Sequence, residues 1–186
     1  MRRLALIAAV ALAVPLAGCG RKVTPRPIVR ATTASAIAPD PPGDERDADG
    51  NPRRGRPDVD IVRVGIDRNS DRALFTITTA AEPRGPLRYE IFAQTTEVSG
   101  YDVVNVTRDG NRLRGYVSFE NSVARQQLSP PSSLSVSDSI LAISVPIDPI
   151  FGATPFQWRL TVSTSAGARI SDVLPSVSGL KTFPER

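Results

Sequence analysis

Phe156-Gln157-Trp158-Arg159-Leu160-Thr161-Val162 is the stretch that decides the fold of this chain, because large apolar residues alternate strictly with polar ones. Successive side chains of a β-strand point to opposite faces, so the apolar side chains of this stretch share one face. Trp158 lies in phase with its apolar neighbours and is therefore expected in the core. The stretch predicts a strand that is buried on one face and solvated on the other.

The same alternation returns along the chain, and helical periodicity nearly vanishes. Arg108-Asp109-Gly110-Asn111 is typical of a hairpin turn, since Asp-Gly supplies the positive φ angles of a tight reversal. The polar stretch 121–137 is expected to contain no strand, because Pro130-Pro131 interrupts it. The predicted strands lie at 62–66, 75–79, 87–93, 101–106, 113–119, 141–145, 156–162 and 169–174. About seven or eight strands without a crossover helix predict an all-β domain, a single antiparallel β-sandwich.

The N-terminal segment resembles a bacterial lipoprotein signal that ends at Leu16-Ala17-Gly18-Cys19. Arg2 and Arg3 form a positive start, and the apolar run after them has about 13 residues, too few to span a bilayer. Cleavage between Gly18 and Cys19 would leave the only cysteine of the chain as the lipidated first residue. The alternative is an ordinary secretory signal with a chance cysteine, although an Ala-x-Ala site is absent.

This signal predicts an exported protein of the cell envelope, with no separate membrane span. A diacylglycerol and an amide-linked fatty acid, such as palmitate, on Cys19 would hold it to the extracytoplasmic face of a membrane, the outer membrane where one exists. The expected organisation is a signal peptide at 1–18, a lipidated and disordered tether at 19–39, a sandwich domain at 40–178 and a tail at 179–186.

The amino-acid composition excludes several classes of enzyme and of binding protein. The chain has no histidine, and Cys19 is assigned to lipid, so His-dependent triads, thiol nucleophiles and His-ligated metals are absent. Lys22 and Lys181 are the only lysines and lie near the ends. We therefore expect a protein that is not an enzyme. The 23 basic residues face 19 acidic ones and are scattered, which is not the footprint of a nucleic-acid-binding protein.

An acidic loop is the one place where ligand chemistry concentrates. Part of it matches the first, third, fifth and last positions of an EF-hand, but Pro52 stands where that loop requires glycine. Two interpretations stay open. The loop forms an irregular calcium site, or its carboxylates are solvated and pair with Arg46, Arg53, Arg54 and Arg56. The acidic and amide side chains are Asp40, Asp44, Asp47, Asp49, Asn51, Asp58 and Asp60.

Three short motifs resemble family 9 carbohydrate-binding modules and DOMON-like sandwiches, including the C-terminal domain of glucodextranase-type enzymes. They are Asp40-Pro41-Pro42-Gly43-Asp44 with the alternating start Pro57-Asp58-Val59-Asp60-Ile61-Val62-Arg63-Val64, the second strand Leu74-Phe75-Thr76-Ile77, and Asp172-Val173-Leu174-Pro175. The resemblance spans about Asp40 to Pro175 and implies a non-catalytic sandwich with calcium near the opening motif. It assigns calcium to Asp40, Asp44 and Asp60, with Asp172 added if the last strand lies beside the first. Paired tryptophans, which sugar binders of the group use, are missing.

These observations favour a membrane-anchored binding or interaction module, with calcium as a structural ion and an unknown envelope protein or glycan as partner. One alternative is a cell-surface carbohydrate-binding protein. Its candidate aromatic residues are Tyr89, Phe92, Tyr101, Tyr116 and Trp158. The other alternative is a carboxylate-dependent hydrolase with two acids about 5–9.5 Å apart. No feature of the sequence selects such a pair.

Overall fold

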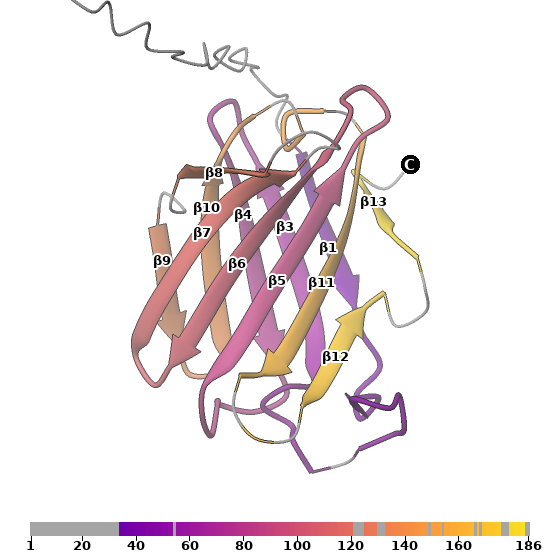
Figure 1. Cartoon of the computed structure of the whole chain (residues 1–186), viewed down its shortest axis with the longest axis vertical. Coiled ribbons are helices and arrows are strands. Elements are labelled where there is room, and N and C mark those ends of the chain that lie inside the picture. Colours follow the sequence, from indigo (N-terminus) through magenta and orange to yellow (C-terminus); the bar gives the residue numbers. More distant parts are fainter. Residues whose placement is uncertain are drawn as a thin grey trace, which may run out of the picture.

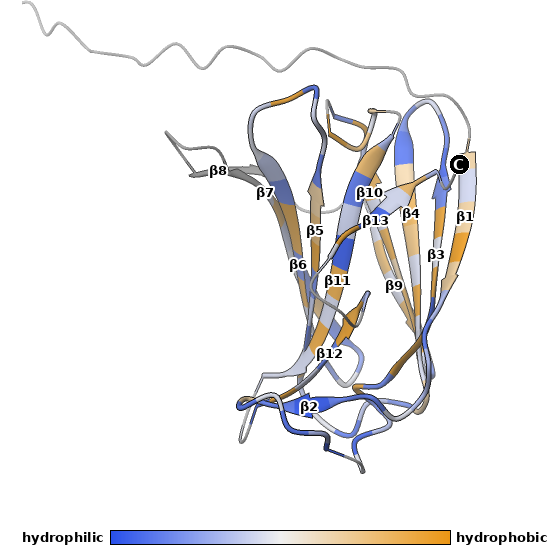
Figure 2. Ribbon diagram, turned by 90° about the vertical axis from the view of Figure 1, so that its right-hand side faces the viewer, coloured by the Kyte–Doolittle hydropathy of each residue, from blue (hydrophilic) through white to orange (hydrophobic). Residues whose placement is uncertain are grey.

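The fold is a sandwich of two antiparallel sheets that pack face to face (Figure 1, Figure 2). The computed structural model describes residues 34–53, 55–120, 125–129, 133–148, 150–153, 155–165, 167, 169–175 and 179–184. These residues contain no helix, so the predicted all-β sandwich is confirmed. Accordingly, no membrane-crossing helix is found among them. The signal peptide at 1–18 and Cys19 lie outside the described residues.

One layer is a five-stranded sheet with the order β1-β3-β4-β10-β9. Its strands are β1 (Ala34–Pro39), β3 (Ile61–Arg68), β4 (Arg72–Thr79), β10 (Ile140–Pro146) and β9 (Ser133–Ser137). The other layer is an eight-stranded sheet with the order β2-β12-β11-β5-β6-β7-β8, and β13 also pairs with β11. Its strands are β2 (Arg46–Asp47), β12 (Ile170–Leu174), β11 (Phe156–Thr164), β5 (Leu87–Gln94), β6 (Tyr101–Asp109), β7 (Arg112–Glu120), β8 (Arg125–Ser129) and β13 (Lys181–Phe183).

The core lies between the layers and follows from the alternation in the sequence. Phe156, Trp158 and Leu160 of β11 are at most 3% exposed, while Arg159 on the other face of the strand is exposed. Trp158 is therefore a core residue, as expected. The Asp-Gly hairpin is also confirmed, because β6 and β7 pair across Gly110, whose φ is +56°.

Four phenylalanines form a chain of ring contacts through the core. Phe75 of β4 contacts Phe151 edge to face with ring centroids 5.7 Å apart, and Phe151 contacts Phe156 in the same way at 5.8 Å. Phe156 then contacts Phe183 of β13 at 5.0 Å. Since β4 belongs to one sheet and β11 to the other, this chain ties the two layers together.

The sandwich extends beyond the limits that the sequence predicts at both ends. Residues 34–39, assigned to the tether, form β1, which pairs with β3 from Ala34↔Arg68 to Pro39↔Arg63. Residues 181–183, assigned to the tail, form β13, and Phe183 is fully buried. β1 consists of small residues and β13 is short, so neither shows clear hydrophobic periodicity. β1 is held by backbone pairing with β3, and β13 by the buried ring of Phe183.

The prediction that 121–137 contains no strand is wrong. Strands β8 and β9 lie in this stretch, on either side of Pro130-Pro131. Both are edge strands, and an edge strand can be polar because only its backbone must pair with one neighbour. In β9, half-buried Leu134 and Val136 alternate with exposed serines, a weak version of the pattern in β11.

Candidate metal centre

The chain passes from β1 to β3 at one end of the sandwich, near β12 (Figure 1). Acidic side chains converge there. Asp40 directly follows β1, and its backbone N–H donates to the carbonyl of Val62, 3.2 Å away. Asp60 directly precedes β3. Asp172 comes from β12 in the other sheet, more than a hundred residues later. The β1–β3 connection and β12 thus bring carboxylates from both layers to one place.

Asp40, Asp44 and Asp172 form the cluster that we call the acidic triad. Each offers one carboxylate oxygen, and the three oxygens lie within 4.8 Å of one another. Asp40 and Asp172 are 7% and 3% exposed, and Asp44 is half-buried. Asp60 is 4% exposed and lies beside the triad, where its Oδ2 accepts a hydrogen bond from Gly43 N–H at 2.9 Å. The four residues that the resemblance selects are therefore brought together.

The triad and the neighbouring Asp60 contain carboxylate oxygens that lack hydrogen-bond partners among the described residues. Asp40 Oδ2, Asp44 Oδ1 and Asp60 Oδ1 are buried and accept no hydrogen bond within the described part of the chain. Asp172 differs, because Ile61 N–H donates to its Oδ2 at 2.6 Å and Val173 N–H to its Oδ1 at 2.7 Å. Buried polar atoms are rarely left without a partner, since each such atom loses its hydration. A bound cation would supply the partners that these oxygens lack.

The charges in the triad repel one another. Burial raises the pKa of Asp40 to about 7, with further contributions from Asp172, Asp44 and Asp60, and Lys181 partly opposes them. The pKa of Asp172 is also raised to about 7, first by burial and then by Asp44 and Asp60, although its backbone hydrogen bonds oppose the shift. A divalent cation would favour the ionised carboxylates and remove this repulsion.

Glu45 is a member of this region that the sequence analysis did not select. It is 2% exposed, and its Oε2 is buried without a hydrogen bond among the described residues. Burial raises the pKa of Asp60, and the charges of Glu45 and Asp44 raise it further, while the hydrogen bond from the Gly43 N–H lowers it. The position of Glu45 next to Asp44 in the opening motif is the signal that could have identified it.

The donor set fits calcium. Calcium takes six to eight oxygen ligands at about 2.3–2.6 Å, from carboxylates, carbonyls and water, in flexible geometry. The triad supplies three carboxylates, and Asp60 and Glu45 supply further charge beside it. A cavity of about 60 Å³ adjoins Asp44 and Asp172 and has room for water. With no histidine in the chain and carboxylates alone in the cluster, the ligands are those of a hard cation.

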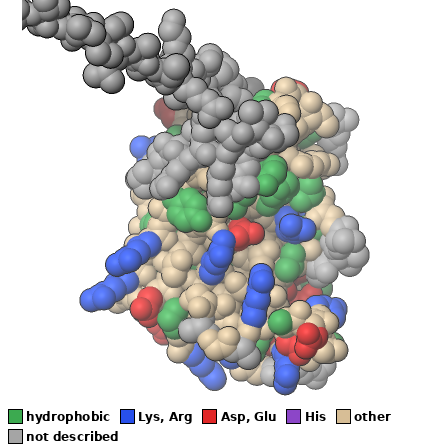
Figure 3. All heavy atoms as spheres, in the orientation of Figure 1, with side chains coloured by type: hydrophobic (Ala, Val, Ile, Leu, Met, Phe, Trp, Pro, Cys, Tyr) green, Lys and Arg blue, Asp and Glu red, His purple; other side chains and the backbone are tan. Residues whose placement is uncertain are grey.

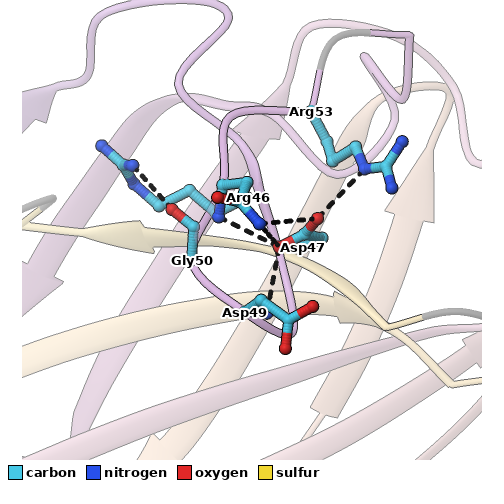
Figure 4. A network of polar contacts seen from close by, with 6 residues as sticks. Arg46, Asp47, Asp49, Gly50 and Arg53 are labelled. Carbon is cyan, nitrogen blue, oxygen red and sulfur yellow. Dashed lines mark hydrogen bonds and ion pairs between the residues drawn. The ribbon is translucent and has the colours of Figure 1, made fainter.

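The remaining acids of the loop have partners of their own. Asp47 Oδ1 accepts from the backbone N–H groups of Asp49 and Asn51, both at 3.0 Å, and Arg53 Nε donates to Asp47 Oδ2 at 3.2 Å (Figure 4). These hydrogen bonds, above all the one from the Asn51 N–H, lower the pKa of Asp47. In this part of the loop the carboxylates are solvated and paired with arginine, which is the second of the two interpretations of the acidic loop. Asp47 does not belong to the triad.

Asp58 is also outside the triad. Arg56 donates to both of its carboxylate oxygens at 2.8 Å, and Arg84 N–H donates to Oδ2 at 3.0 Å. Asp58 is fully buried, and these bonds satisfy it. Asp47 and Asp58 match the first and last positions of an EF-hand loop, but both bind arginines of the same loop, Arg53 and Arg56.

The aromatic candidates for a sugar platform divide between the two faces of the eight-stranded sheet. Tyr89 is 1% exposed and Trp158 3%, so both belong to the core. Phe92 and Tyr101 lie on the outer face with ring centroids 4.8 Å apart, and Tyr116 is half-buried on that face. The predicted lipidation and cleavage residues, Gly18 and Cys19, are outside the described part of the chain.

Comparisons with protein-family models, with curated proteins and with solved structures found no match for this chain.

Proposed function

We propose that this chain is an envelope lipoprotein that presents a non-catalytic β-sandwich as a binding module, and that the acidic triad holds one structural calcium ion. The observation that carries the calcium site is the set of buried carboxylate oxygens of Asp40, Asp44 and Asp60 without hydrogen-bond partners among the described residues. Three of the four residues that the sequence resemblance selects contribute oxygens within 4.8 Å of one another.

The proposed ion has a structural role because its ligands come from both sheets. Asp40 directly follows β1, in the five-stranded sheet, and Asp172 belongs to β12, in the eight-stranded sheet. Asp44 lies in the loop between β1 and β3. An ion held by these three residues would join the layers and order the loop, and its binding free energy would add to the stability of the fold.

A non-catalytic role is supported by the size and composition of the site. The cavity at the triad is about 60 Å³, far below the 300–1,000 Å³ of typical small-molecule sites. Its carboxylate oxygens lie within 4.8 Å of one another, which favours a shared cation over the water-filled gap of an inverting hydrolase. Without histidine, the chain also lacks the usual general base at neutral pH.

The anchor belongs to the same proposal. Cys19 would carry the acyl chains, and residues 20–33 would link it to β1 at Ala34. A diacylglycerol together with an amide-linked acyl chain supplies more than the two lipid signals that stable attachment requires. The module would then stand at the extracytoplasmic face of a membrane, where calcium is available and a surface ligand is within reach.

Thermal unfolding with and without calcium tests the ion. The metal-stripped protein is melted at pH 7.5 in chelator, in calcium and in magnesium. Calcium at about 100 times its Kd stabilises by about 2.7 kcal/mol, which for a domain of this size raises Tm by about 5–10 °C. Magnesium should act more weakly, because it requires near-ideal octahedral geometry.

Two variants make the test specific. Asp40→Asn removes one charge of the triad, so it should raise the Tm of the metal-free protein and reduce the calcium shift. Asp49→Asn removes a charge from the same loop, at an exposed residue outside the triad, and should leave both values unchanged. No calcium shift in the parent protein, or equal loss of the shift in both variants, would refute the proposed site.

A further inference from the structure

A second cavity lies on the outer face of the eight-stranded sheet, and we call it the outer groove. Its volume is about 570 Å³, within the range of ligand sites, and it is formed by β5, β11, β12 and the turn between β11 and β12. Three arginines, Arg88, Arg159 and Arg169, line it against one acid, Glu90. Figure 3 views this face of the molecule and shows Lys and Arg side chains spread across it.

The strand register sets the spacing of the two strand-borne arginines. Arg88 of β5 pairs with Ser163 of β11, whereas Arg159 of β11 pairs with Phe92 of β5. Positions 159 and 163 are four residues apart on one strand, so the two arginines lie on rows separated by about 13 Å. A ligand chain with repeated negative charges can contact both rows at once.

Neighbouring side chains orient both arginines. Arg88 Nε and Nη2 donate to Asn105 Oδ1 at 3.2 and 2.7 Å, and Nη2 also donates to Glu90 at 2.8 Å. The guanidinium of Arg159 lies over the ring of Phe92, 5.9 Å from its centroid. Both side chains are nevertheless exposed, so their outer N–H groups face solvent. Oriented guanidinium groups lose less entropy when they bind a carboxylate.

The rest of the lining is hydroxylic. Thr161, Ser165 and Ser171 line the groove with partly or fully exposed side chains, and Val173 is the one apolar residue among the described residues that line it. Such a surface offers donors and acceptors in a row and little area for apolar side chains. It suits a ligand rich in hydroxyl groups better than a peptide with hydrophobic anchors.

We propose that the outer groove binds an acidic polysaccharide, with the carboxylates of its uronic acid residues on Arg88 and Arg159 and its hydroxyls on the Ser and Thr side chains. Arginine and carboxylate form charge-assisted hydrogen bonds, for which Arg159 offers its guanidinium and Arg88 its Nη1, and repeated carboxylates match the repeated arginines. This inference rests on the proposed role as a binding module and adds the class of ligand.

The outer groove and the acidic triad share a wall. Ser171 and Val173 of β12 line both cavities, and Asp172 between them belongs to the triad. Saccharide binding is therefore measured on protein that has been loaded with calcium and then freed of excess ion, which also keeps calcium from bridging the saccharide itself.

Calorimetric titration with matched saccharides tests the proposal. The probes are a hexamer of β-1,4-linked glucuronic acid and cellohexaose, which has the same linkage without the carboxylates. We expect the acidic hexamer to bind at least tenfold more tightly. Arg159→Gln and Arg88→Gln should each weaken it about tenfold, the effect of one charge-assisted hydrogen bond. Arg63→Gln, at an exposed arginine of β3 in the opposite sheet, should change nothing.

Several outcomes would overturn the acidic-polysaccharide site. They are absence of binding, equal binding of cellohexaose, equal binding of hexaglutamate (an acidic peptide used as a third probe), or equal weakening by Arg63→Gln. If Arg88→Gln fails to fold because Asn105 and Glu90 lose their partner, Arg159→Gln decides the matter. The calcium shift in Tm is measured on the same samples. If the protein shows the calcium shift but does not bind the saccharide, only the saccharide site is refuted. If it binds the saccharide but shows no calcium shift, only the calcium site is refuted.

Discussion

Asp172 of β12 accepts a hydrogen bond from the backbone N–H of Ile61, the first residue of β3, at a distance of 2.6 Å. The two strands belong to different sheets, so a side chain of one layer satisfies the backbone of the other. Ile61 is fully buried, and its N–H would have no access to water without this carboxylate. Asp172 therefore serves the fold directly, in addition to its place in the acidic triad.

Replacing Asp172 separates these two roles. Asp172→Ala leaves the Ile61 N–H buried without an acceptor, so it should lower the free energy of unfolding by about 1–3 kcal/mol in chelator. Asp172→Asn removes a repelling charge and keeps one acceptor oxygen, for the Ile61 N–H, while the Val173 N–H loses its acceptor, so it should destabilise clearly less than alanine. Urea unfolding at pH 7.5 measures both variants. If asparagine destabilises as much as alanine, the hydrogen bond to Ile61 does not have the role assigned to it.

The metal-free protein should become less stable as pH rises. The pKa values of Asp40 and Asp172 are about 7 in the fold and near 3.8 in the unfolded chain, so the folded state binds more protons between these values. The free energy of unfolding in chelator should therefore fall from about pH 4 to about pH 7 and then level off. Urea unfolding across this range measures it.

Calcium should reverse that trend, because it binds the ionised carboxylates and competes with protons. The stabilisation by calcium should be small at pH 5 and should grow toward pH 8. Asp40→Asn should flatten the curve in chelator, whereas Asp49→Asn should leave it unchanged. Stability in chelator that rises from pH 4 to 7 in the parent protein would contradict the raised pKa values.

Different parts of the structure were predictable from the sequence to different degrees. Strand β11 was predicted almost residue for residue, because burial on one face forces apolar and polar residues to alternate. Strands β1, β8 and β9 were missed because edge strands are held by backbone pairing, which places few demands on side chains. In β3, a bulge between Ile61 and Arg63 shifts the phase, so Val62 is half-buried, although the alternation placed it with Val64 and Ile66.

The candidate site shows the same limit. The acidic loop was evident from composition, yet composition alone did not separate Asp40, Asp44 and Asp60 from Asp47 and Asp58. That separation depends on whether Arg53 and Arg56 reach a carboxylate, which is a matter of loop conformation. Asp172 lies far away in sequence, and only the motif resemblance suggested it. Glu45 was not selected, because its burial follows from packing that no local pattern reports.

The chain of phenylalanine contacts should account for a large part of the stability. Phe156→Ala removes a fully buried ring that contacts both Phe151 and Phe183, so it should lower the free energy of unfolding by about 3–5 kcal/mol. Phe92→Ala removes the same group from the outer face, where the ring is half-buried, and should have a clearly smaller effect. Equal destabilisation by the two variants in urea unfolding would show that the rings do not form the core as described.

Cys19→Ser tests the proposed anchor. The parent protein, expressed in a bacterial host, should incorporate labelled palmitate and sediment with the membranes. The serine variant should incorporate none and should keep its signal peptide, because lipidation precedes cleavage at such sites. Gel mobility, label and fractionation measure the three properties. Equal labelling of the serine variant would contradict lipidation at Cys19.

The calcium ion at the acidic triad is the central claim, and direct titration calorimetry of the metal-stripped protein with calcium tests it most directly. We expect one calcium ion per chain for the parent protein and for Asp49→Asn. The double variant Asp40→Asn/Asp44→Asn should bind none, while it keeps the cooperative unfolding of the sandwich. No heat of binding in the parent protein at millimolar calcium, or an unchanged stoichiometry and affinity in the double variant, would contradict the proposed site.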